Sequence, residues 1–409
     1  MSAAGMLDDL VVVDLSGITA GGRSTQLLAD FGADVIKVES YDRPDTFRNW
    51  AAVTGAAEAG DLSSPPFRVV GRNKRAIAVD LRDPAGLEVA RRLVEKADIV
   101  VENFRRGVLE KLNLGFEQLR RWNPRIVLLS LSSQGSAGPS RNYISYGVTL
   151  EALGGLMSMT GYGDGVPVWT TPKVNYPDQI VAILGPTLAV AAVRESRRTG
   201  RGAWLDLSQR ELVTALLGES VLQSELTGQP AVAPQQELAG DGIVVQAAGD
   251  DAWIAVTASG QDMAVLLAYL EAHADAQDKA AAVTTPAAQR AEALLRAWAR
   301  KQDKFAAMAA LQAADIACAA VLTAKDVVEQ GAARDDGLYL QVPLPNGDKV
   351  ESQVGWPFEI TPNQGGARIR RRAPHIGEHS SDILRSLGFA EAEIRQLIDS
   401  KIVHQPAAN

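Results

Sequence analysis

Short β-branched runs alternate with segments of helical spacing at the start of the chain. Leu10–Val13 predicts a strand, and Gly17–Gly22, which is rich in turn-forming residues, predicts a loop. Ser24–Phe31 then has the spacing of an amphipathic helix that Gly32 ends, and Val35–Val38 predicts the next strand. This order indicates a βαβ unit.

The same alternation continues along the chain. Asp83 and the following proline form a strong start signal for a helix over Pro84–Lys96, between predicted strands at Ile77–Val79 and Ile99–Val101. The further elements expected are helices over Phe116–Trp122, Leu150–Met159 and Gln179–Arg197 and strands over Ile126–Leu129 and Ala203–Leu207. Alternating units of this kind fold into a parallel sheet covered by helices. We therefore predict an α/β protein with a Rossmann-like large domain.

The periodic pattern breaks at Thr227–Pro234, where Gly, Pro and Gln replace regularly spaced apolar residues. Strand patterns at Ile243–Val245 and Trp253–Val256 then precede Ala-rich helical segments, which is typical of a smaller α+β domain. The amphipathic segments within 373–403 have no local partner, so we expect them to return to the first domain. The predicted domains are 1–227 as the first part of the large domain, 228–325 as the small domain, and 326–409 as a linker and C-terminal return.

Composition narrows the class of protein. The 409 residues exceed what one hydrophobic core supports, and 46% hydrophobic with 22% charged residues is typical of a globular chain. A net charge of -8 would repel a phosphate backbone, so we expect no nucleic-acid partner and interpret Arg368–Arg372 as a solvated basic face. The apolar stretch Ile180–Val193 is too short to span a bilayer, so we expect no membrane partner. The single cysteine, Cys318, favours a reducing compartment, and we expect a cytoplasmic location.

The distribution of histidines limits the chemistry. His273, His375, His379 and His404 are the only four, so any reaction carried by the first 272 residues runs without imidazole. His375 and His379 have the spacing of paired metal ligands but lack the glutamate of a metalloprotease motif, and we predict no metal site. The glycines of the first loop do not follow the dinucleotide-binding pattern, although a nicotinamide enzyme remains an alternative from the fold outline alone.

Several motifs occur together in a fixed order. They are Leu27–Glu39, Asn73–Pro84, Val101–Phe104 with Gly107–Lys111, Asn123–Arg125, Thr199–Gly202 and Gly377–His379. In this order they closely resemble the class III CoA-transferases, the family of formyl-CoA and carnitine CoA-transferases. The resemblance covers most of residues 7–225 and the C-terminal segment, whereas the middle, roughly 228–325, matches only weakly.

The resemblance implies a reaction in which CoA passes from an acyl-CoA, with succinyl-CoA as an expected donor, to a carboxylic acid. It implies an interlocked homodimer of ring-like subunits, with a hetero-oligomer containing a related subunit as an alternative, and no tightly bound cofactor. The family's nucleophile is an aspartate shortly before a long helix that ends at Thr199–Gly202, and Asp178 occupies that position here.

The chemistry of a carboxylate supports this assignment independently. An aspartate can attack a thioester carbonyl to give a mixed anhydride, and the released CoA thiolate can return to the aspartyl carbonyl. No proton has to be moved, which agrees with the histidine-free first 272 residues. The alternative for Asp178 is that it caps the following helix as its N-cap residue.

The resemblance also places CoA and the acyl group. By position, residues lining the CoA site are Ile18, Val79, Arg82, Asn103, Phe104 and Lys111, of which the two cations are equally explained as solvated charges. Residues expected near the acyl group or its oxyanion are Gln26, Trp50, Gln134, Tyr146, Gly240 and Gly242, with Tyr143 and Trp169 as further candidates for the pocket wall. Two departures are visible, because Ser40 stands where some relatives have arginine and Ser132–Gln134 replaces a more usual Gly-aromatic pair.

Two other functions remain open. Racemases of 2-methylacyl-CoA share the superfamily but use a histidine where this chain has Tyr146. A noncatalytic CoA-binding subunit is the second alternative, because the stretch before Asp178 is about two residues longer than in relatives and the small domain lacks their run of four glycines.

Overall fold

The computed structural model describes residues 5–50, 64–161, 166–170, 175–231, 242–273, 275–281, 287–332, 338–344, 350–358, 360 and 366–406. Two compact units result. The larger comprises the described residues within 1–160, 167–231 and 337–409, and the smaller those within 161–166 and 232–336. The middle of the chain is thus a separate unit inserted into a fold that both ends of the chain build.

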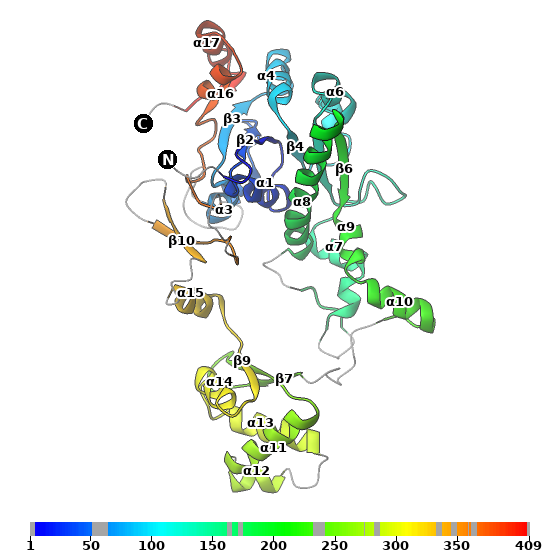
Figure 1. Ribbon diagram of the computed structural model, residues 1–409, viewed down its shortest axis with the longest axis vertical. Coiled ribbons are helices and arrows are strands. Elements are labelled where there is room, and N and C mark those ends of the chain that lie inside the picture. The colour runs from blue at the N-terminus through cyan, green and yellow to red at the C-terminus, as the bar shows by residue number, and fades with distance from the viewer. Residues whose placement is uncertain are drawn as a thin grey trace. The chain divides into compact units, whose positions relative to one another are not determined.

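A seven-stranded sheet organises the larger unit (Figure 1). Its strands are β1 (Val11–Asp14), β2 (Asp34–Glu39), β3 (Arg75–Val79), β4 (Ile99–Glu102), β5 (Val127–Ser132), β6 (Ala203–Ser208) and β12 (Val403–His404). The order is β12-β3-β2-β1-β4-β5-β6, and every pairing is parallel except that of β12 with β3. The predicted parallel sheet is confirmed, with one antiparallel strand added at its edge by the C-terminus.

Helices cover both faces of this sheet. The helices of the larger unit, of which α10 has no buried residue, are α1 (Ala20–Asp30), α3 (Pro65–Gly71), α4 (Pro84–Lys96), α5 (Val108–Lys111), α6 (Phe116–Trp122), α7 (Gly147–Gly154), α8 (Tyr176–Thr199), α9 (Gln209–Ala215), α10 (Gly218–Thr227), α16 (Ser380–Ser386) and α17 (Glu391–Asp399). Two 3-10 helices, η1 (Thr46–Asn49) and η2 (Leu156–Met159), and a hairpin of β10 (Tyr339–Pro343) with β11 (Val350–Val354) complete the unit.

The alternation of side chains along each strand divides the interior into two cores. Val13 and its neighbours pack with residues of α4, α6, α16 and α17, so the C-terminal helices seal the same face as the helix after β3. Val12 faces the other way and packs with residues of α1 and α8. Figure 1 shows the red C-terminal helices beside the cyan α4 at the β3 side of the sheet.

Helix α8 is long and apolar enough to cross a membrane by length and composition. Its side chains Val181, Ala189 and Val193 are nevertheless buried against the sheet, in the core that α1 shares. One face of the helix therefore belongs to the core of the α/β fold, while other apolar side chains of α8, such as Ile183 and Leu188, are exposed.

Two local predictions are wrong. Gly17–Gly22 is only partly a loop, because α1 begins at Ala20 and includes both following glycines. A Cβ at Gly21 would overlap the side chain of Ser16, so this glycine permits close packing of helix on loop. The helix predicted over Leu150–Met159 is split into α7 and η2, because Gly155 adopts a left-handed conformation with φ 91°.

The smaller unit is an α+β fold of its own. Its strands β7 (Gly242–Gln246), β8 (Trp253–Thr257) and β9 (Ala317–Ala320) form an antiparallel sheet in that order. Its helices are α11 (Gly260–His273), α12 (Ala276–Ala281), α13 (Ala287–Ala299), α14 (Lys304–Gln312) and α15 (Ala324–Ala332). One cluster joins the sheet to α11, α13 and α14, and it includes the buried Cys318.

Candidate functional site

The strand order of the large sheet changes direction at β1. The strands that follow β1 in sequence, β2 and β3, extend to one side, whereas β4, β5 and β6 extend to the other. The loops that leave the carboxyl ends of β1 and β4 therefore diverge and open a crevice, the place where α/β sheets bind ligands. Two adjoining cavities occupy this crevice.

The first cavity has a volume of about 540 Å³ and lies over the carboxyl ends of β1 to β4. Five of the six residues predicted to line the CoA site line it, namely Ile18, Val79, Arg82, Asn103 and Phe104. Lys111 does not, because it is exposed on α5 away from the cavity wall. The structure thus brings together most of the residues predicted to line the CoA site, although they come from three separate loops.

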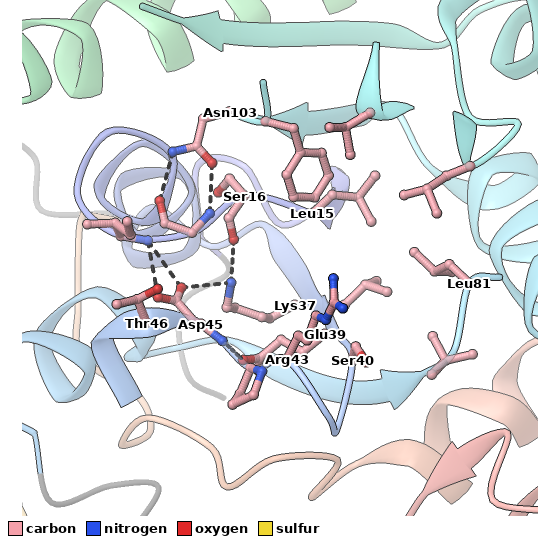
Figure 2. A pocket seen from close by; sticks show the side chains of 18 of the residues that line it. Leu15, Ser16, Lys37, Glu39, Ser40, Arg43, Asp45, Thr46, Leu81 and Asn103 are labelled. Carbon is pink, nitrogen blue, oxygen red and sulfur yellow. Dashed lines mark hydrogen bonds and ion pairs between the residues drawn. The ribbon is translucent and has the colours of Figure 1, made fainter. Parts of the chain in front are cut away.

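A pair of reciprocal hydrogen bonds shapes the floor of this cavity (Figure 2). The side chain of Asn103 accepts from the backbone N–H of Gly17 and donates to its carbonyl, each at 2.8 Å. The next residue, Ile18, has φ 59° and donates its backbone N–H to the carboxylate of Asp45 at 3.2 Å. A β-branched residue rarely adopts this conformation, so the loop is held in a strained shape by its neighbours.

Buried charges lie directly beneath the loop. Lys37 forms an ion pair with Asp45 at 3.1 Å and donates to the carbonyl of Ser16, and all three side chains are buried. Burial alone would lower the pKa of Lys37, but Asp45, Asp14 and Glu39 outweigh it and raise that pKa. Burial and the lysine act on Asp45 in opposite senses, and the net effect lowers its pKa. The pattern of hydrophobic residues in the sequence does not identify this network. The one signal is Lys37, because a lysine inside a buried strand is unusual.

Cations gather at the rim of the first cavity. Arg82 is tied to Asp80 by two hydrogen bonds of 2.8 and 2.9 Å. Arg43 and Arg105 also line the cavity, and within the described part of the chain neither forms an ion pair. Sequence patterns do not identify Arg43, which lies three residues after the serine that replaces the arginine of some relatives. These guanidinium groups can bind phosphate oxygens.

The second cavity is larger, with a volume of about 1170 Å³. It shares Ile18, Thr46, Asn103, Phe104 and Arg105 with the first cavity, so one elongated ligand can occupy both. The predicted site residues that line it are Asp178, Trp50, Gln134, Tyr146, Tyr143 and Trp169. The side-chain amide of Gln134 is buried at this cavity. Its Nε2 donates a hydrogen bond to the hydroxyl of Ser145, and its Oε1 has no hydrogen-bond partner in the described structure.

Asp178 lies in the first turn of α8 and faces this second cavity. Burial raises the pKa of Asp178 to about 7. Its Oδ2 accepts a hydrogen bond of 2.6 Å from the side chain of Asn175, which is the N-cap residue of the helix. The alternative that Asp178 itself is the N-cap is therefore wrong, and its carboxylate is left oriented but incompletely solvated.

Two more predicted site residues, Gln26 and Gly242, line neither cavity, as is also true of Lys111. Gln26 is buried within α1, where it bonds to Arg23 and Asp30. Gly242 is the first residue of β7 in the smaller unit, and Gly240 lies outside the described residues. A role of these glycines at the oxyanion stays a prediction.

The histidines of the C-terminal motif have structural partners. The ring Nδ1 of His379 accepts from the backbone N–H of Ala76 at 3.2 Å, which fixes the C-terminal segment to β3. Among the described residues, no group of three His, Cys, Asp or Glu side chains is arranged to hold a metal ion.

Known proteins resemble this chain over most of its length. The profile of CoA-transferase family III matches residues 7–380. The succinyl-CoA–D-citramalate CoA-transferase of Chloroflexus aurantiacus is 28% identical, covering 97% of this chain and 98% of that one. The succinyl-CoA:mesaconate CoA-transferase of Haloarcula hispanica is 30% identical, covering 94% of this chain and 97% of that one. A crystal structure of a CaiB/BaiF family protein from Brucella suis has a TM-score of 0.80 at 26% identity, covering 94% of this chain and 100% of that chain.

Proposed function

The chain belongs to CoA-transferase family III and is an enzyme of that class, and we propose that it transfers CoA between carboxylic acids through covalent intermediates on Asp178. The single observation that carries this proposal is the position of Asp178, a partly buried carboxylate in a cavity that shares lining residues with the arginine-lined first cavity. A carboxylate with few solvating partners is a stronger nucleophile than one in water.

The proposed reaction has four bond changes. A carboxylate oxygen of Asp178 attacks the thioester carbonyl, and CoA thiolate leaves to give a mixed anhydride. The thiolate attacks the aspartyl carbonyl and releases the donor acid, which leaves an aspartyl-CoA thioester. The acceptor carboxylate attacks that thioester to form a second anhydride, and the returning thiolate attacks its acyl carbonyl to release the new acyl-CoA and regenerate Asp178.

Each half of CoA has a matching cavity in this proposal. The nucleotide and its phosphates occupy the first cavity, where Arg43, Arg82 and Arg105 supply positive charge and Val79 supplies an apolar wall. The pantetheine arm passes the shared residues Ile18 and Asn103 toward Asp178. Lys111, which lies outside the cavity, is left as a solvated charge.

Finer features of the proposal rest on the family resemblance. We propose succinyl-CoA as a donor, because the two relatives above are named for it. An interlocked homodimer is proposed as the assembly, with no tightly bound cofactor because CoA enters as a substrate. A cytoplasmic location is proposed from the single cysteine, Cys318.

Turnover with a panel of acyl-CoA donors and free acids tests the proposal directly, with mass measurement of the new thioesters. Asp178→Asn should abolish exchange, while the matched variant of an exposed carboxylate, Asp399→Asn, should retain it. Borohydride added during turnover should reduce the thioester on Asp178 and mark that residue for peptide mapping. Undiminished exchange by Asp178→Asn would exclude the mechanism, and no exchange by the wild type with any pair would favour a noncatalytic CoA-binding subunit.

A further inference from the structure

A cation lines the second cavity without a charged partner. Arg23 lies in the first turn of α1, is partly buried, and contributes to the wall of the cavity that holds Asp178. It does not line the first cavity, where the phosphates of CoA are proposed to bind. Three other arginines, Arg105, Arg106 and Arg141, also line the second cavity, but all three are exposed, whereas Arg23 is partly buried.

The neighbours of Arg23 orient it but do not neutralise it. Its Nη1 donates to Oε1 of Gln26 at 2.7 Å, and no described carboxylate lies within ion-pairing distance. Gln26 in turn donates to Asp30 at 2.6 Å, and Asp30 is already paired with Arg72 at 2.7 Å. Burial and the nearby Arg72 lower the pKa of Arg23, which Asp30 only partly offsets. Most of the donors of Arg23 remain available for an anion.

The position of Arg23 in its helix is unfavourable without such an anion. The first turn of a helix carries partial positive charge from its free N–H groups, and a cation there is repelled. The residues around this end of α1, Thr19 and Ala20, line the same cavity. A bound carboxylate would interact favourably with both the guanidinium and the helix terminus. A cation placed at an unfavourable helix end, on the wall of a cavity, is typical of a functional residue.

We propose that Arg23 binds the second carboxylate of a dicarboxylic acid substrate while the first carboxylate, or its thioester, reacts at Asp178. This inference rests on the proposed function and specifies its substrate class. No bond is made or broken at Arg23, which acts by binding alone. Gln26 is a positioning residue, since it holds the guanidinium and is itself fixed by Asp30.

The separation of roles agrees with the electrostatics of the nucleophile. Burial raises the pKa of Asp178, and no cation contributes to the shift. Arg23 therefore does not neutralise the nucleophile, and its charge is left for a different carboxylate. A monocarboxylic acid of the same length would leave this charge in the cavity without a partner.

Steady-state kinetics with succinate and butyrate as acceptors test the inference, because these acids differ in one carboxylate and have the same chain length. Arg23→Met should raise the KM for succinate by about tenfold or more and leave the KM for butyrate unchanged. Arg23→Lys, which keeps the charge without the planar fork, should show a smaller rise. Arg120→Met, at an exposed arginine of α6, should behave as the wild type. Equal losses for both acids, or no loss for either, would overturn the inference.

A binding measurement separates this inference from the proposed function. Calorimetric titration of Asp178→Asn with succinyl-CoA and with butyryl-CoA needs no turnover. Adding Arg23→Met to the Asp178→Asn variant should weaken the binding of succinyl-CoA by about tenfold and leave the affinity for butyryl-CoA unchanged. Equal weakening of both would assign Arg23 to the CoA moiety and overturn the inference, while wild-type enzyme that transfers CoA to no acid would instead reject the proposed function. If Arg23→Met does not fold, as judged by circular dichroism, Arg23→Gln replaces it in both experiments.

Discussion

Asn103 and Gly17, which are 86 positions apart in the sequence, are joined by two hydrogen bonds of 2.8 Å that fix the loop after β1 to the loop after β4. Strands β1 and β4 are directly paired, and this clamp extends their connection to the two loops at the point where the strand order changes direction. The amide of Asn103 is thus one of the groups, with Asp45 and Lys37, that hold the backbone facing the proposed CoA site.

Asn103→Ala removes both bonds, and we expect the KM for acyl-CoA to rise by up to about thirtyfold because each lost hydrogen bond contributes about 1 kcal/mol. Initial-rate measurements at varied acyl-CoA concentration would detect it. Asn49→Ala is the matched control, since Asn49 is exposed and lines neither cavity. An unchanged KM in Asn103→Ala would show that the clamp has no part in binding.

Ile18 combines a strained backbone with a position on both cavities. In Ile18→Gly the left-handed conformation is free of the penalty of about 1–2 kcal/mol that a Cβ causes, which offsets the flexibility gained by the unfolded chain. We expect a free energy of unfolding that does not fall, together with a higher KM for acyl-CoA because apolar contact is lost. Urea denaturation and kinetics on the same preparation give both quantities. A clear loss of stability would contradict the interpretation of strain.

The pH dependence of turnover should follow Asp178, because only its ionised form is the nucleophile. Its pKa of about 7 means that kcat/KM falls by about tenfold per pH unit below that value. A profile measured from pH 5 to pH 9 with a fixed donor and acceptor checks this. A profile that stays flat down to pH 5 would mean that the carboxylate titrates near its ordinary value in the working enzyme.

The difference in stability between Asp178→Asn and the wild type should grow as the pH rises. Because the folded-state pKa of Asp178 lies above the ordinary value of 3.8, the folded protein favours its protonated form, and the contribution of Asp178 to wild-type stability falls as pH rises from about 4 through about 7. Asparagine does not ionise, so the variant should gain stability relative to the wild type across this window. Thermal melts of both proteins at pH 4, 6 and 8 measure the difference, and a gap that narrows with rising pH would be the wrong sign.

Lys37→Met should be strongly destabilising. It leaves Asp45 and Asp14 buried without one of their counterions, and loss of one partner of a buried pair costs about 3–5 kcal/mol. Urea denaturation at pH 7 would measure the loss. Lys325→Met, at an exposed lysine 3.7 Å from Glu329, should change stability by less than about 0.5 kcal/mol. Equal free energies of unfolding for the two variants would mean that the buried ion pairs of Lys37 make no net contribution to stability.

Local signals determine much of this protein. The period of apolar residues predicts the parallel sheet, and α4 and α6 begin and end at the residues that the sequence indicates, because caps and periodicity act within a few residues. The family resemblance, with the spacing to Thr199–Gly202, points to Asp178 in the sequence. The scarcity of histidine limits the chemistry available to the first 272 residues.

Tertiary structure alone decides which of these residues meet. Arg23 is indistinguishable in sequence from a solvated helical arginine, and only the packing of α1 against the crevice makes it part of a cavity wall. Lys111 follows a matching motif yet lies outside the cavity, and Gly21 continues a helix where the composition indicates a turn. The physical reason is that propensity and periodicity extend over a few residues, whereas a cavity depends on strand order and on contacts between loops far apart in the chain.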